Sequence, residues 1–163
     1  PKAFPNLFDS NGKPLYDTDW ERLVYRPNWA QNHELSVRGG GDKTTYSLSL
    51  GYTDQGGLII NSWFKRYSAK FTLDNEVKKW LNIGGSIFVN RTTQRVVDDA
   101  SGGLNVPRMV QEAIPILPIK YPDGTWGRNK DWPGMEGGEN PVRLTEERQR
   151  INNATQALGE IYT

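Results

Sequence analysis

The single histidine of this chain, His33, limits the acid–base and metal chemistry that the chain could perform. A Ser-His-Asp triad or a histidine-based zinc site would have to use it, and no second motif accompanies it. Its place near the start of an alternating segment indicates an interfacial or packing residue instead. The chain has no cysteine, which excludes disulfides, thiolate nucleophiles and thiolate metal ligands. We therefore expect no enzyme activity, no catalytic residue, no metal site and no cofactor.

Two short segments look superficially like ligand-binding loops but lack the required spacing. Residues 39–44 are rich in glycine, yet the G-x-x-x-x-G-K-[ST] pattern of a phosphate loop is absent and no helical pattern follows. A hairpin turn explains them better. The acidic residues at 9–12 and 17–19 lack the later Glu that a calcium loop needs. We interpret them as a turn and as the cap of a short helix, with Asp17 or Thr18 as the capping residue.

Aromatic and hydrogen-bonding residues are interspersed between positions 121 and 132. Flat aromatic faces beside polar side chains suit sugar rings or peptide side chains. The candidate ligand-binding residues are Tyr121, Trp126, Arg128, Asn129, Asp131 and Trp132. Alternatively, these aromatics pack the loop against itself or against a protein that covers it. Packing is the favoured interpretation, since large loops need internal aromatic contacts to stay ordered.

The elements that must position these residues are strands of alternating polarity. Between residues 44 and 53, large apolar side chains alternate with Thr, Ser and Gly; similar runs follow at 66–74 and 81–90, and a shorter one precedes them at 32–38. Such alternation places one face of each strand in apolar surroundings. It predicts an all-β antiparallel meander whose apolar positions are Tyr46, Leu48, Leu50, Tyr52, Tyr67, Phe71, Leu73, Ile83, Ile87 and Val89.

Two classes of protein fit these strands. In a soluble all-β carbohydrate-binding module, a second sheet would cover the apolar face; in an outer-membrane barrel, lipid would cover it. Tyr46 and Tyr52 bracket Leu48 and Leu50, as aromatic girdles at the two membrane interfaces would. The 20 basic and 19 acidic residues nearly cancel, so no net field recruits nucleic acid. Alternation alone leaves the choice between the two classes open.

The lengths of the connections differ between the two ends of the expected sheet. Short turns at 39–43 and 75–79 would lie at one end; the longer segments 1–31, 54–62 and 94–147 would lie at the other. Outer-membrane barrels have short turns inside and long loops outside. We therefore expect an extracellular loop region at 1–31, four strands in 32–93, a long extracellular loop with a short helix after Pro107 in 94–147, and the start of another strand in 148–163.

Several segments, taken in order, carry a family resemblance: Asp17 to Trp20, Gln31 to Gly40, Tyr46 to Tyr52, Gln55 to Ile59, Phe64 to Tyr67 and Leu73 to Gly85. They resemble the early barrel region of the SusC/RagA family of TonB-dependent outer-membrane transporters of Bacteroidetes. Two further stretches, Ala113 to Gly124 and Asn140 to Val142, are similar to the long external loop of that family. No single motif is specific, but their succession covers most of the chain.

The resemblance implies part of a large plugged barrel of about 22 strands in the bacterial outer membrane. Such a transporter imports oligosaccharides or peptides, works with a SusD-like surface lipoprotein, and is driven by TonB through a part of the protein outside this sequence. The ten apolar strand positions would then face lipid. We expect the chain to be a fragment without the plug domain, and its sheet to aggregate in isolation because its edges are unpaired.

Overall fold

The computed structural model describes residues 6–97, 105–132, 134–135 and 137–163, so the expectations for residues 1–5, 98–104, 133 and 136 lie outside the described part. The chain divides into two compact units. One comprises Pro1–Pro27, Leu58–Ser62 and Val96–Arg150, and we call it the loop unit. The other comprises Asn28–Gly57, Trp63–Arg95 and Ile151–Thr163, and it is a sheet.

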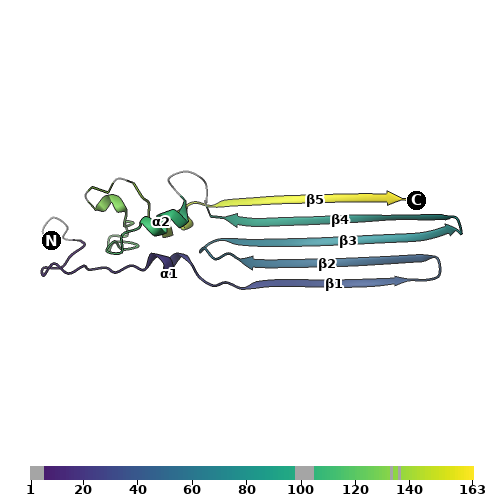
Figure 1. The fold of residues 1–163 in the computed structure, drawn as a ribbon, viewed down its shortest axis with the longest axis horizontal. Coiled ribbons are helices and arrows are strands. Elements are labelled where there is room, and N and C mark those ends of the chain that lie inside the picture. The colour runs from purple at the N-terminus through teal and green to yellow at the C-terminus, as the bar shows by residue number, and fades with distance from the viewer. Residues whose placement is uncertain (1–5, 98–104, 133, 136) are drawn as a thin grey trace. The chain divides into compact units, whose positions relative to one another are not determined.

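The sheet has five strands whose spatial order is their order along the chain. Figure 1 shows them side by side with alternating directions, which confirms the predicted all-β antiparallel meander. Their bounds are β1 (Ala30–Gly40), β2 (Thr44–Gly56), β3 (Trp63–Lys78), β4 (Leu81–Val96) and β5 (Arg150–Tyr162). Because successive strands are antiparallel, the short β1–β2 and β3–β4 turns lie at one end of the sheet, and the longer β2–β3 and β4–β5 connections leave from the other.

The pairing register keeps all the alternating segments in phase. Val37 lies opposite Leu48, Leu48 opposite Phe71, and Phe71 opposite Ile87. Directly opposed residues project to the same side of a sheet, so this row and its neighbours form one continuous apolar face. A register shift between Glu76 and Lys78, a bulge beside the β3–β4 turn, is the one irregularity in the three pairings from β1 to β4.

The loop unit holds the hydrophobic core. Its helices are α1 (Trp20–Val24), α2 (Val106–Glu112) and α3 (Pro141–Glu147), with the 3-10 turn η1 (Asn129–Asp131). The buried apolar side chains are Leu7, Trp20, Val24, Val97, Val106, Met109, Val110, Leu117, Val142 and Leu144. No helix in the described ranges is long and apolar enough to cross a bilayer. Helices of five to seven residues are marginal alone, so this shared core must stabilise them.

The cap of α1 corrects a detail of the sequence prediction. The capping residue is Asp19, whose carboxylate accepts the backbone N–H of Arg22 at 2.9 Å, and not Asp17 or Thr18. Thr18 is engaged elsewhere, because its hydroxyl donates to the carbonyl of Leu117 at 2.6 Å. A cap must immediately precede the first helical residue, and a helix start predicted two residues early misplaces it.

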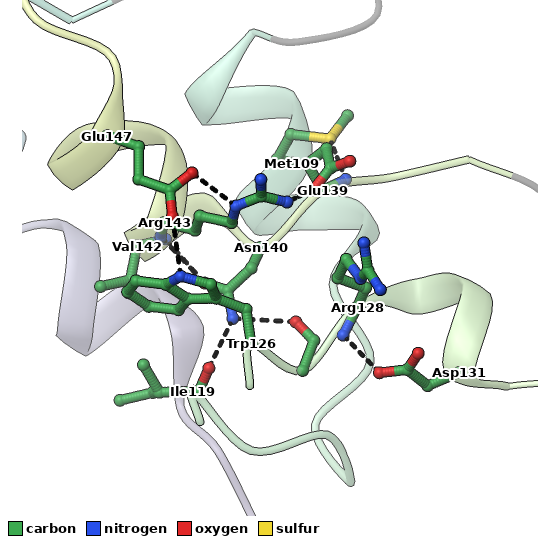
Figure 2. A network of polar contacts seen from close by, with 11 residues as sticks. Met109, Ile119, Trp126, Arg128, Asp131, Glu139, Asn140, Val142, Arg143 and Glu147 are labelled. Atoms are coloured by element: carbon green, nitrogen blue, oxygen red, sulfur yellow. Dashed lines mark hydrogen bonds and ion pairs between the residues drawn. The ribbon is translucent and has the colours of Figure 1, made fainter. Parts of the chain in front are cut away.

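Asn140 joins α3 to the chain segment before it. Its amide oxygen accepts the backbone N–H groups of Val142 and Arg143, at 3.0 and 3.1 Å. Its amide nitrogen donates to the carbonyls of Ile119 and Gly127, at 3.0 and 2.9 Å (Figure 2). The side chain is buried, and it satisfies four backbone groups, of which the Gly127 carbonyl and the Val142 N–H are bonded in buried surroundings.

We predict that Asn140→Ala destabilises the loop unit by about 2–4 kcal/mol, since it removes a cap and leaves two carbonyls unpaired. Hydrogen exchange of the 117–128 and 140–148 peptides in the intact protein measures the effect. Asp19→Ala is the matched control: this exposed cap accepts the Arg22 N–H, and its loss should cost about 1 kcal/mol. Equal, small losses of protection in both variants would contradict the bridging role of Asn140.

Candidate functional site

The apolar face of the sheet is the first candidate site. All ten apolar strand positions named from the sequence lie on this face, because they share its alternating positions in the paired strands. The register places nine of them opposite another of the ten or a small or aliphatic residue, while Ile83 lies opposite Asn75. Leu48 and Phe71, at its centre, are 39% and 42% exposed, and Ile87 is 59% exposed. The second sheet that a sandwich would lay over them is not found among the described residues, which form a single sheet. The face therefore presents large apolar side chains directly to the surroundings.

The opposite face is polar, and on β2 to β4 it is the less exposed one, whereas β1 and β5 are exposed on both faces. The rows behind the apolar residues carry Ser, Thr, Asn, Arg and Lys; Ser36 and Ser49 share a hydroxyl hydrogen bond of 3.1 Å, and Asn90 donates to Gln156 at 3.0 Å. On β2, Leu48 and Leu50 are exposed while Ser49 between them is half-buried. This reverses the usual rule for soluble sheets, in which the polar side faces water and the apolar side is covered. Phe88 is an aromatic exception on the polar face, opposite Lys70.

Aromatic side chains lie near both ends of the apolar face. At the end where the long connections leave, Tyr52 stacks on His33 with ring centroids 6.3 Å apart and lies 5.0 Å from the ring of Tyr67. At the other end, Trp80 is 77% exposed and has the ammonium of Lys78 5.4 Å from its ring centroid. The rows between are mainly aliphatic, with Phe71 as an aromatic member of the central row and Tyr46 close to the short turns. This order of aromatic, aliphatic and aromatic residues matches the surface of a strand that crosses a lipid interface twice.

The strands are longer than the alternating sequence runs suggested. β3 and β4 have 16 residues each, and β2 has 13. A tilted strand needs about 9–11 residues to cross the hydrocarbon of a bilayer. These strands meet that length with residues to spare at both ends.

A groove of about 730 Å³ in the loop unit is the second candidate site. Four of the six residues named as ligand-binding line it, namely Tyr121, Trp126, Arg128 and Asp131. The remaining lining comes largely from the N-terminal segment, including Leu15 and Tyr16. The ring of Tyr16 meets that of Tyr121 edge-on, with centroids 6.4 Å apart. Aromatic faces and carboxylates therefore share one open concave surface.

Tyr121 and Asp131 form the polar wall of this groove. The phenol of Tyr121 donates to the Asp131 carboxylate at 3.2 Å, and the same carboxylate accepts the backbone N–H of Arg128 at 2.9 Å. Burial and the neighbouring Asp131 charge raise the pKa of Tyr121 to about 12. The phenol is thus a stable donor at neutral pH.

Trp126 is held by charged groups rather than left free. Its indole N–H donates to Glu147 at 2.9 Å (Figure 2). The ammonium of Lys120 lies 4.0 Å from its ring centroid. Glu147 also accepts a hydrogen bond of 2.7 Å from Arg143, which lies 2.9 Å from Glu139. The hydrogen bond from Arg143 is the main cause that lowers the pKa of Glu147. The tryptophan ring is therefore fixed in orientation.

The other two named residues lie outside the lining of the groove. Asn129 is buried, and its amide donates to the carbonyl of Glu112 at 3.0 Å. Trp132 contacts Phe8, with ring centroids 6.1 Å apart. Both contacts hold the loop unit together, which is the alternative that the sequence left open for the loop aromatics. Among the described residues, no three His, Cys, Asp or Glu side chains gather as metal ligands do.

Sequence reasoning missed Asn140 and the charged group behind Trp126. A signal for both exists: Asn followed by Pro marks a helix start, and Glu139, Arg143 and Glu147 follow at a spacing of four. No signal in the sequence predicts that this helix contacts Trp126 through Glu147.

Comparisons with curated proteins give three relatives of one kind. The chain is 37% identical to TonB-dependent receptor SusC of Bacteroides thetaiotaomicron, over 89% of this chain and 16% of that protein. It is 30% identical to TonB-dependent receptor P3 of Formosa agariphila, over 69% of this chain and 12% of that protein. It is 26% identical to TonB-dependent receptor P26 of the same species, over 76% of this chain and 11% of that protein. The chain thus spans 11–16% of the length of these relatives. No protein-family model matches it.

We predict that Tyr121 ionises near pH 12 in the folded loop unit, against 10.0 for an ordinary tyrosine. A raised folded pKa stabilises the folded state fully below pH 10 and ceases to do so as the pH rises through about 12. The difference in phenolate absorbance between the intact protein and its Tyr121→Phe variant isolates this group. A phenolate that forms near pH 10 would show that the burial and the Asp131 contact are absent in solution.

Proposed function

This chain belongs to the SusC-like TonB-dependent receptors, and from that premise we propose that it forms part of the barrel wall of an outer-membrane importer. One observation carries the proposal, namely the inverted sheet, whose apolar face is exposed and whose polar face is partly covered. A barrel wall requires this arrangement, since its outer side meets lipid and its inner side meets a wet lumen. The antiparallel meander with no crossover is the topology of such walls.

The energetics favour lipid over water at the apolar face. Each large apolar side chain moved from water into hydrocarbon gains about 1.5–3 kcal/mol. The alternative, a soluble carbohydrate-binding module, would leave this face in water or require a second sheet from elsewhere. Strand edges also favour the barrel, because further strands on either side of β1 and β5 would pair the backbone groups that a five-stranded sheet leaves open.

The two ends of the sheet suggest its orientation. The short turns between β1 and β2 and between β3 and β4 would lie on the periplasmic side. Residues 1–31, 54–62 and 94–147 would then be extracellular, so the loop unit would lie where substrate arrives. Transport would use energy delivered by TonB to a part of the receptor outside this sequence, and no catalytic step is needed here.

For the cargo we propose an oligosaccharide or a peptide, held in part by the loop groove and delivered with a SusD-like lipoprotein. The groove presents the aromatic faces of Tyr121 and Trp126 and the acceptor oxygens of Asp123 and Asp131. Aromatic faces stack on sugar rings or apolar side chains, and carboxylates accept their hydroxyl or amide protons. Lys120 covers part of Trp126 and the ring also packs against the core, so a ligand would contact the part of the ring that lines the groove.

Replacing Leu48 with Lys should cost about 2–4 kcal/mol if the site lies near the membrane midplane, and should lower the amount of full-length receptor in outer membranes. Phe71→Lys should act in the same way, because the two residues face each other. Ser49→Lys is the matched control, because Ser49 neighbours Leu48 but projects to the polar face. If Leu48→Lys and Ser49→Lys assemble equally well, the apolar face does not contact lipid.

Replacing Trp126 with Ala in the full-length receptor should weaken cargo binding by about tenfold, because loss of an aromatic platform removes roughly 1–2 kcal/mol. Isothermal titration with the receptor's oligosaccharide or peptide cargo measures this. Trp132→Ala separates the two roles of the loop aromatics, since Trp132 packs on Phe8 outside the groove lining. If the groove binds cargo, Trp132→Ala should affect the affinity less than Trp126→Ala. If the affinity is unchanged in both variants, the groove is not part of the binding site.

A further inference from the structure

A shallow hollow of about 570 Å³ lies on the apolar face, wholly within the sheet. It is centred on a cross-strand row in which Leu50 opposes Ala69 and Ala69 opposes Val89. The single methyl group of Ala69 leaves a depression between its two larger neighbours, and Leu35 continues the row on β1. A floor of this kind suits a hydrocarbon chain rather than a polar ligand.

One end of the hollow is bounded by a row of rings and a cation. His33 opposes Tyr52, Tyr52 opposes Tyr67, and Tyr67 opposes Arg91. Arg91 is exposed and makes no hydrogen bond or ion pair with any other residue in the described ranges. Asp54, on the same face as Tyr52, is already engaged, since it accepts the Tyr52 hydroxyl at 2.9 Å and lies 3.6 Å from the ammonium of Lys65. Glu34 is the carboxylate among the lining residues; it lies on β1 opposite Gly51, with β2 and β3 between it and Arg91. The guanidinium therefore lacks an anion.

We propose that this hollow binds an anionic, phosphate-bearing lipid, with one acyl chain over Ala69 and the phosphate on the Arg91 guanidinium. Arg91 follows Val89, the last aliphatic residue of this face on β4, so it lies where the apolar band ends. A cation on the lipid side of a barrel is tolerated at the headgroup level, and a guanidinium matches two phosphate oxygens at once. The inference rests on the proposed function and places the lipid in the outer leaflet, because the long connections leave from this end.

The test uses the full-length receptor in a neutral detergent, titrated with phosphatidylglycerol and observed by native mass spectrometry. Arg91→Gln should weaken phosphatidylglycerol binding about tenfold, the effect of losing a hydrogen-bonded charge pair. Arg66→Gln is the matched control: Arg66 is exposed and adjacent to Tyr67, but it projects to the polar face. Phosphatidylcholine with the same acyl chains should bind the wild-type receptor more weakly than phosphatidylglycerol.

In the titrations, unchanged binding by Arg91→Gln, an equal loss in Arg66→Gln, or equal binding of the two lipids would overturn the proposal. A receptor dimer that buries the hollow and excludes lipid would also overturn it in favour of a second copy as the occupant. Failure of the proposed function has a different signature, since the wild-type receptor would then not insert into outer membranes at all. If it inserts but Arg91→Gln has no effect, the lipid site alone is wrong.

Discussion

The structure depends on the apolar face of its sheet, which is left exposed to the surroundings. Strand residues alternate between two sides with a period of two, so a register that aligns Leu48 with Phe71 and Phe71 with Ile87 gathers large apolar side chains on one side. On the inner strands β2 to β4 that side is the more exposed one, and the polar side is the more covered. An apolar environment makes such a sheet stable, and in the proposed barrel wall the lipid of the outer membrane would supply it. Strand length, aromatic ends and a crossover-free meander are consistent with this environment.

The loop unit shows the opposite arrangement, with its apolar side chains buried inside and its polar groups satisfied by hydrogen bonds. It buries an apolar core, and side-chain caps satisfy the backbone N–H groups at its helix starts. Asn140 makes the most hydrogen bonds of these caps, because it also donates to the carbonyls of Ile119 and Gly127. The same unit carries the groove with Tyr121 and Trp126. Their rings are held by Asp131 and Glu147, so the groove is formed before any ligand arrives. A preformed surface loses less conformational entropy on binding.

Much of the sheet could be predicted from sequence because its determinants are local. Alternation located the strands, but not all of their ends: β3 continues to Lys78, through most of the segment 75–79 that the sequence predicts to be a turn. The loop unit could not be predicted in the same way, since its contacts join residues far apart: Tyr16 meets Tyr121, and Asn140 meets Ile119. The mixture of aromatic and polar residues in this loop pointed to a binding surface, and four of the six candidate ligand residues line one groove. Asn129 and Trp132 lie outside the lining because internal packing uses the same residue types.

The central claim is that the apolar face meets hydrocarbon, and neighbouring positions on opposite faces test it directly. Phe71 and Thr72 are adjacent on β3 and project to opposite sides, and the chain has no cysteine of its own. Spin labels placed singly at these positions in the full-length receptor, within a bilayer, can be probed with oxygen and with a water-soluble relaxation agent. The account predicts that the label at 71 responds to oxygen and that at 72 to the aqueous agent. Equal aqueous access at both positions, or protection of 71 from both agents, would contradict it.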